Sequence, residues 1–161
     1  MPHDSQKVEH MQLLFQFLSF APGPFWLLIL FLPGNRWAML AVDLFLILLA
    51  GLFAWQTIPI IPQILPLLLE PKFDEMHAFL SSEAGFVGSW NHMILSDLWI
   101  GRWVAQDTRQ FSRPLLVRLL CIPPILLFGP LGLFCYLLLR MAACRKLAIN
   151  SPSSPNPAVI D

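Results

Sequence analysis

Three ionisable side chains stand at five-residue spacing in an otherwise mainly apolar segment of this 161-residue chain. They are His92, Asp97 and Arg102, and tryptophans lie among them. A carboxyl group in apolar surroundings can act as a general acid, an imidazole as a general base, and a guanidinium can stabilise developing negative charge. We therefore take these three as candidate catalytic residues, with Asp97 as the acid, His92 as the base and Arg102 as the charge stabiliser.

A helical period divides the segment into two stripes. One holds Trp90, Ile94, Asp97 and Gly101 and is expected to face other helices, and the second holds His92, Ser96, Trp99 and Trp103. Gly101 would allow a close helix approach. Because the stripes lie far apart around the helix, we expect no direct contact between His92 and Asp97. Trp90, Trp99, Trp103 and Ser96 are candidate substrate-binding residues, with packing or interfacial anchoring as the alternative.

The composition indicates an integral membrane protein. Hydrophobic residues make up 57% of the chain and charged residues 12%, where a soluble domain carries about 25% charged residues. Ten basic side chains balance ten acidic ones, so no net field would attract a nucleic acid. No Asp, Glu, Lys or Arg occurs in residues 10–35, 44–69 or 119–139, and each window exceeds the roughly 20 apolar residues that cross a bilayer. The lipid bilayer is thus the expected partner, in either a plasma or a photosynthetic membrane.

The expected fold class is all-α, a bundle of four transmembrane helices that run up, down, up and down. A polar N-terminal tail, residues 1–10, precedes a single domain, residues 11–140, and a disordered Ser/Pro-rich tail, residues 141–161, follows it. The predicted spans cover about residues 11–32, 38–56, 84–104 and 114–140.

Prolines predict where these helices bend or stop. Pro22 and Pro24 should kink the first span, and a tight turn is expected at residues 33–37. Four prolines within residues 57–71 argue against a regular helix there, so this apolar connection between spans two and three should lie in the membrane interface, followed by a short surface helix at residues 73–80. Three further prolines predict that the fourth span is one bent helix.

The charges within the spans form the next expectation. In a four-span bundle Asp43, Asp97, Arg102 and Arg118 share one leaflet, so two acids and two bases could neutralise one another in a charge network. Structural alternatives stay open: Arg102 can snorkel to lipid phosphates, Asp97 can serve only as an ion-pair partner, and His92 can join two helices by a hydrogen bond.

Orientation should follow the side that carries more Lys and Arg. The four-span arrangement places five on each side: Lys7, Lys72, Arg140, Arg145 and Lys146 beside the termini, and Arg36, Arg102, Arg109, Arg113 and Arg118 opposite. The sequence therefore leaves the orientation open.

Several segments together resemble a known family. The run from Trp90-Asn91-His92 to Asp97-Leu98-Trp99-Ile100-Gly101-Arg102-Trp103 resembles the W-x-H-x4-D-L-x-x-G-R-W signature of the neoxanthin-synthase-like membrane family, the relatives of the plant abscisic-acid-deficient-four protein. Residues 128–133 with Tyr136 and Arg140 look like the family's fourth-helix ending, and residues 24–28 and 36–37 are similar to its first helix and turn. The resemblance covers about residues 13–140; residues 93–96 and Trp99 depart from the plant pattern.

The resemblance implies carotenoid chemistry, since plant members are required to make neoxanthin from violaxanthin. Opening an epoxide to an allenic alcohol is an isomerisation, so it needs an acid and a base and no redox cofactor. The sequence has no histidine cluster typical of a di-iron site and no glycine fingerprint for NAD or flavin, so we expect neither a metal nor a cofactor. The alternatives are a non-catalytic carotenoid-binding or assembly protein and a small transporter subunit with Asp43, Asp97 and His92 as a proton relay. The oligomeric state stays open.

Overall fold

A computed structural model describes residues 2–144, with side chains from Glu9 to Ala143. This range contains helices and short turns and no strand, which confirms the all-α class. The elements are α1 (Pro2–Phe20), α2 (Gly23–Phe31), α3 (Arg36–Thr57), the 3-10 turn η1 (Ile58–Ile60), α4 (Ile61–Leu69), α5 (Phe73–Leu80), α6 (Glu83–Asp107), the 3-10 turn η2 (Thr108–Gln110), α7 (Pro114–Phe128) and α8 (Pro130–Cys144).

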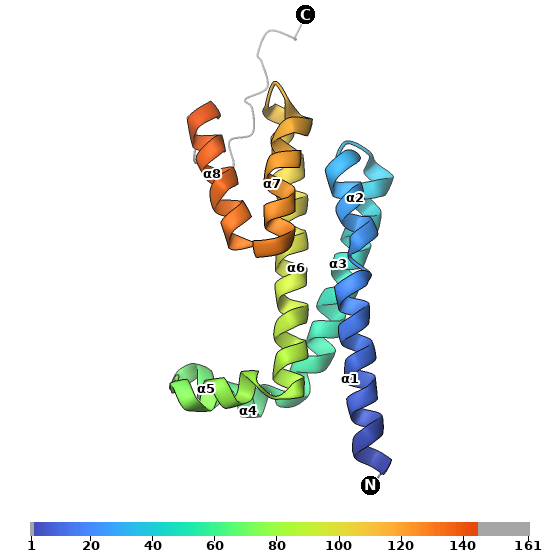
Figure 1. Cartoon of the computed structure of the whole chain (residues 1–161), viewed down its shortest axis with the longest axis vertical. Coiled ribbons are helices and arrows are strands. Elements are labelled where there is room, and N and C mark those ends of the chain that lie inside the picture. Colours follow the sequence, from blue (N-terminus) through green and yellow to red (C-terminus); the bar gives the residue numbers. More distant parts are fainter. Residues whose placement is uncertain (1, 145–161) are drawn as a thin grey trace, which may run out of the picture.

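The long helices run alongside one another, with α6 in contact with α1, α2, α3 and α7 (Figure 1). The prolines of the first span act as predicted: α1 ends at Phe20 and α2 begins at Gly23, with Pro24 in the first turn, where no backbone donor is needed. The expected tight turn follows, and Asn35 caps α3 by accepting hydrogen bonds from the Trp37 and Ala38 backbone amides at 2.9 and 3.2 Å.

Helices extend into both predicted tails. Residues 2–10 belong to α1, because no Gly or Pro interrupts the chain between positions 3 and 21. At the other end α8 continues to Cys144, four residues beyond the predicted boundary. The predicted disordered tail beyond residue 144 lies outside the described residues.

The proline-rich connection between α3 and α6 is helical, contrary to expectation. Pro59 and Pro62 occupy the first turns of η1 and α4, where the missing amide costs no hydrogen bond, and only Pro66 lies inside α4. Figure 1 shows α4 and α5 crossing one end of the bundle. Side chains such as Ile61 and Leu68 are exposed on this arm, and the expected short helix at residues 73–80 is α5.

The predicted fourth span is two antiparallel helices and not one bent helix. The chain keeps its helix through Pro123 and Pro124 and reverses at Gly129, whose φ of +27° is unfavourable for any residue with a Cβ. A Cβ at Gly132 would overlap the α7 backbone, so this second glycine lets α8 pack closely on α7. The hairpin therefore returns α8 to the end of the bundle where α6 terminates (Figure 1).

Two helical stretches in the described part of the chain are long and apolar enough to cross a membrane. They are residues Glu9–Phe31, which combine most of α1 with α2, and Arg36–Leu69, which begin with α3. The helices α7 and α8 are apolar but shorter. The structure thus supports a membrane protein and does not confirm the predicted four-span bundle.

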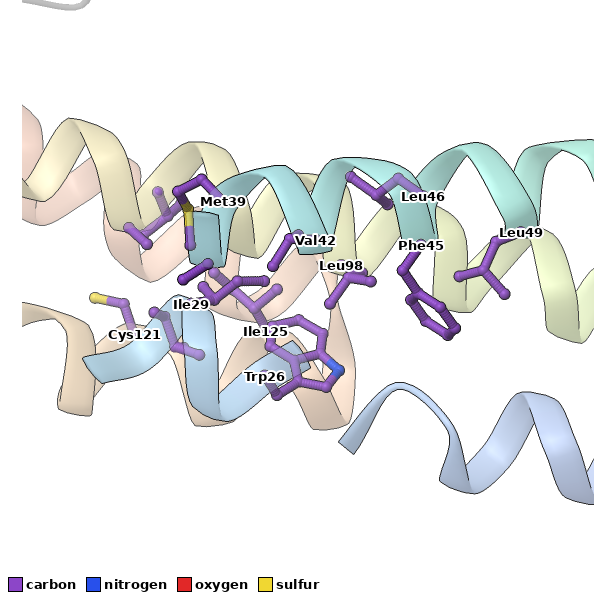
Figure 2. Packing of buried hydrophobic residues seen from close by; sticks show 14 of the residues in the cluster. Trp26, Ile29, Met39, Val42, Phe45, Leu46, Leu49, Leu98, Cys121 and Ile125 are labelled. Carbon is purple, nitrogen blue, oxygen red and sulfur yellow. The ribbon is translucent and has the colours of Figure 1, made fainter. Parts of the chain in front are cut away.

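The core lies where α2, α3, α6 and α7 meet. Ile29, Val42, Leu98 and Ile125 contribute one side chain from each of these helices and are fully buried (Figure 2). The cluster also includes Trp26, Met39, Phe45, Leu46, Leu49 and Cys121. This packing fixes the position of α6 relative to the break between α1 and α2.

Candidate functional site

A cavity of about 510 Å³ opens beside the break between α1 and α2. Its volume falls within the roughly 300–1,000 Å³ that small-molecule sites occupy. Its wall is mostly apolar and contains one ionisable group, Asp97. The lining residues are Ser19, Phe20, Pro22, Gly23, Trp26, Leu27, Trp90, Met93, Ile94, Asp97, Leu126 and Leu127.

The predicted interior stripe of α6 forms one wall of this cavity. Trp90, Ile94 and Asp97 line it, and Gly101 continues the stripe against the Trp26 ring, where a Cβ would overlap the indole. Gly101 thus allows the close helix approach that the sequence predicts. The stripe is confirmed as the face that α6 turns toward α2.

Asp97 lies at the tip of the α7–α8 hairpin. Its carboxylate occupies the space that a Cβ on Gly129 would take. Gly129 therefore leaves room for the carboxylate, and it also permits the chain to reverse. Among the described side chains, Asp97 has no hydrogen bond or ion pair. A carboxyl group without a protein partner, at the wall of a cavity, is available to a ligand.

The other polar groups of the cavity wall already have partners. Trp90 donates from Nε1 to the Ser19 hydroxyl at 3.2 Å, and that hydroxyl donates to the Phe15 carbonyl at 2.8 Å. The Trp90 ring also packs against Phe15, with centroids 5.4 Å apart. This chain ties α6 to α1 and holds the Trp90 indole in a fixed orientation beside the cavity.

Arg102 faces a different helix. Its Nη2 donates to Asp43 Oδ2 at 2.6 Å. Its Nε is in ion-pair contact with Oδ1 but has no hydrogen-bond partner among the described residues. The ion pair joins α6 to α3. Five residues separate Asp97 from Arg102, which is about 140° around a helix, and this turn explains why they face different neighbours.

The predicted four-member charge network does not form. Asp43 and Arg102 pair, whereas Arg118 is buried on α7 at 8% exposure and its Nε has no hydrogen-bond partner among the described residues. Neither Arg118 nor Asp97 has an ion-pair partner in the described part of the chain.

His92 lies apart from the Asp97 cavity. It packs against Phe53, with ring centroids 5.5 Å apart, and lines a second cavity of about 290 Å³ between α3, α4, α5 and α6. The expected separation of the two stripes is thus observed. Asp97 and His92 thus line separate cavities, and the role of His92 as the base stays a prediction.

Three of the predicted substrate-binding residues lie away from the cavity wall. Trp99 is 62% exposed on the outer surface of α6. Trp103 meets Tyr136 of α8 edge-on at a centroid distance of 5.6 Å. Ser96 is partly buried and does not line the cavity. Of the four predicted substrate-binding residues, Trp90 lines the cavity.

Two polar clusters were missed by sequence reasoning. At the end of α6, Arg140 Nε donates to Asp107 Oδ2 at 2.7 Å, and the Tyr136 hydroxyl donates to the same oxygen. The four-span prediction puts Arg140 at the opposite end, because it treats residues 114–140 as one helix. The i, i+4 spacing of Tyr136 and Arg140 indicates only that the two side chains share one helix face.

The second missed cluster is centred on Asn91, which is fully buried between α6 and α3. Its Nδ2 donates to the Leu49 carbonyl at 3.4 Å and to Gln56 Oε1 at 3.2 Å, and its Oδ1 has no partner within the described residues. Together with the Asp43 and Arg102 pair, Asn91 joins α6 to α3 by polar contacts.

No group of three His, Cys, Asp or Glu side chains suited to a metal occurs among the described residues.

Comparison with known proteins identifies the family. The chain belongs to the ABA DEFICIENT 4-like family, whose family model matches residues 13–136. That range includes the cavity, the α6 motif and the hairpin up to Tyr136. The comparisons with curated proteins and with solved structures found no match.

Proposed function

We propose that this protein is a multi-pass membrane protein that binds a xanthophyll in the Asp97 cavity and isomerises it by proton transfer without a cofactor. The single observation that carries the proposal is the cavity itself: an apolar wall with two indoles and one carboxyl group that has no described partner. Membership of the ABA DEFICIENT 4-like family supports a link to carotenoids.

The proposed topology has three crossings and one re-entrant hairpin. The helix α6 is less apolar than the two candidate spans, but its 25 residues give about 37 Å at 1.5 Å per residue, more than the roughly 30 Å of a hydrocarbon core. The helices α7 and α8 have 15 residues each, about 22 Å, too short to cross. The hairpin would enter the bilayer, turn at Gly129 beside Asp97, and return.

The cavity suits a polyene that arrives from the lipid. Its rim is formed by Phe20, Leu27 and Leu127, which are 59–79% exposed on the outside of the bundle. In a membrane these side chains contact acyl chains, so a hydrophobic ligand could enter sideways without passing through water. The indoles of Trp26 and Trp90 provide flat apolar surfaces for such a ligand.

The chemistry needs one carboxyl group in two protonation states. Asp97 in its acid form gives its proton to the epoxide oxygen as a C–O bond breaks. The resulting carboxylate then removes a proton from the neighbouring carbon, and the electrons of that C–H bond form the new double bond. The product is an isomer of the substrate and Asp97 regains its proton, so no oxidant or reductant is required. His92 has no part in this sequence, because it lies outside the cavity.

The test is turnover by the purified protein in lipid nanodiscs that contain violaxanthin or related epoxides. We expect an allenic product from the wild type, no product from Asp97→Asn, and a bound polyene spectrum in both. Asp74→Asn is the matched control, since Asp74 is exposed on α5 and should leave turnover unchanged. Equal product formation by Asp97→Asn would exclude the proposed mechanism, and absence of bound polyene from both proteins would exclude the ligand class.

A second candidate is a non-catalytic carotenoid-binding protein. The observation in its favour is that no second acid or base lines the cavity with Asp97. This candidate predicts a bound polyene with no product from the wild type, so the same assay separates it from the enzyme.

A further inference from the structure

The charges of the molecule are segregated between its two ends. One end, here called the arginine end, is where α6 terminates and where α3 and α7 begin; the opposite end carries the α4–α5 arm and the start of α1. The arginine end holds Arg36, Arg102, Arg109, Arg113, Arg118 and Arg140. The opposite end holds Glu9, Glu70, Asp74, Glu75 and Glu83, with Lys72 as its basic residue among the described side chains.

The returning helix α8 strengthens this segregation by one residue. In a four-span bundle Arg140 would stand at the opposite end, and the basic residues with described side chains would divide five to two. In the structure Arg140 binds Asp107 at 2.7 Å, which places it at the arginine end. Among the described side chains the basic count is then six at the arginine end and one, Lys72, at the other.

Several of these arginines have no protein counter-ion. The carboxylates of Asp43 and Asp107 are occupied by Arg102 and Arg140. Arg36, Arg109 and Arg113 are exposed, and none has an ion pair within the described part of the chain.

Arg118 adds an observation that points to a ligand. It is 8% exposed, and its Nε has no partner among the described residues. It lies four residues into α7 from Pro114, about 6 Å from the helix start. A buried guanidinium without a counter-ion is costly, and an anion at the membrane surface could reach it at this depth.

Arg36 shows the arrangement expected at a membrane surface. Its guanidinium carbon lies 5.1 Å from the centre of the Trp37 ring, and Trp37 is 67% exposed. Tryptophan rings favour the headgroup level of a bilayer, and a guanidinium beside such a ring is placed among lipid phosphates.

We propose that the arginine end faces the side from which the chain is inserted into the membrane and binds anionic lipid headgroups through Arg36, Arg109, Arg113 and Arg118. The inference rests on the membrane-spanning part of the proposed function, but not on its chemistry. Short segments rich in Lys and Arg stay on the side of insertion, and anionic headgroups attract basic side chains at that surface. The acidic α4–α5 arm would then lie on the far side.

Orientation can be tested with two matched serines. Ser112 lies between η2 and α7 at the arginine end, and Ser81 lies between α5 and α6 at the other; both are exposed. The full chain, with its three cysteines replaced by alanine, would carry Ser112→Cys or Ser81→Cys in a bacterial inner membrane. A membrane-impermeant maleimide should label Ser112→Cys in inside-out vesicles and Ser81→Cys in right-side-out vesicles.

The outcomes distinguish this inference from the proposed function. Reversed labelling, or labelling of both variants from both sides, would overturn the orientation and leave the Asp97 chemistry untouched. Release of the protein by alkaline carbonate would overturn the membrane-spanning proposal and this inference with it. Loss of pigment turnover would affect neither labelling result.

Lipid binding is tested by reconstitution in phosphatidylcholine mixed with phosphatidylglycerol, followed by measurement of the lipid that stays with the purified protein. We expect phosphatidylglycerol to be enriched over the bulk mixture. The Arg109→Gln/Arg113→Gln variant and the Arg118→Gln variant should each lower the enrichment, whereas the Asp74→Asn control should not. Equal enrichment in all variants would overturn the lipid contact, as would full displacement of the lipid by inorganic phosphate, since that would indicate a site for free phosphate.

Discussion

On the side of α6 that packs against α3, Asn91 donates two hydrogen bonds, and Arg102 donates one hydrogen bond to Asp43 within an ion pair. On the side that faces α2 and the hairpin tip, Asp97 has no described partner and lines a cavity. Polar groups in an apolar environment are tolerated when they are paired. The α3 side therefore uses its polar groups to join helices, and the cavity side leaves one carboxyl group available for a ligand.

The largest expected effect contrasts Asp97→Asn with Arg102→Gln. The first should lower turnover by about 10²–10⁴-fold, the usual contribution of a general acid or base, and should not destabilise the fold because no described partner is lost. The second should keep turnover per folded molecule, because Arg102 is bound to Asp43 outside the cavity. Chromatography of the pigment products measures both. A turnover loss in Arg102→Gln as large as that of Asp97→Asn would return Arg102 to the catalytic site.

The next effect concerns stability on the α3 side. Asp43→Asn and Arg102→Gln should each lower the free energy of unfolding by about 1–3 kcal/mol, since each leaves its partner unpaired in a partly buried position. The double variant should lose less than the sum of the single losses, because neither charge is then left alone. Unfolding in detergent measures this double-mutant cycle. Strict additivity would mean that the ion pair does not join α3 to α6.

The sequence predicts features that arise within one helix better than features that depend on how several helices pack. The stripe of Trp90, Ile94, Asp97 and Gly101 follows from the helical period alone, and so does its separation from His92. The partner of Arg102 could be proposed because helices α3 and α6 have the predicted directions. The burial of Arg118 without an ion-pair partner among the described residues could not be predicted, because it depends on how α7 packs on its neighbours.

The reversal itself shows why local patterns were insufficient. Three prolines suggested a bend, yet α7 continues through Pro123 and Pro124, and the chain turns at Gly129 because of its positive φ and the close approach at Gly132. A glycine that stands beside a proline is compatible with a bend or a full turn, and tertiary packing decides between them. The same holds for α4, where Pro59 and Pro62 fall at helix starts that the sequence alone does not locate.

A third prediction tests the wall of the cavity with two glycines of α6. In Gly101→Ala the new Cβ would overlap the Trp26 ring, so we expect a loss of about 1–3 kcal/mol from overpacking and weaker polyene binding as the ring moves. Gly88→Ala is the matched control, because nothing lies within 4 Å of its Cβ position, and it should stabilise α6 by about 0.5–1 kcal/mol. Thermal unfolding and absorbance of bound pigment report the two effects. Equal stability changes at the two positions would mean that Trp26 does not pack on Gly101.

The smallest expected effect compares Ser19, which accepts a hydrogen bond from Trp90, with Ser96, which lies outside the cavity. Ser19→Ala removes the acceptor for Trp90 Nε1 at 3.2 Å, which should cost about 0.6 kcal/mol, the mean for a polar contact between membrane helices. Ser96→Ala on α6 removes a hydroxyl that does not line the cavity and should change stability less. Because the indole of Trp90 would be free to rotate in Ser19→Ala, the tryptophan fluorescence anisotropy of the protein, to which all six tryptophans contribute, should fall in that variant alone. If both variants behave alike in stability and anisotropy, the orientation of Trp90 is set by its packing on Phe15 and not by the hydrogen bond to α1.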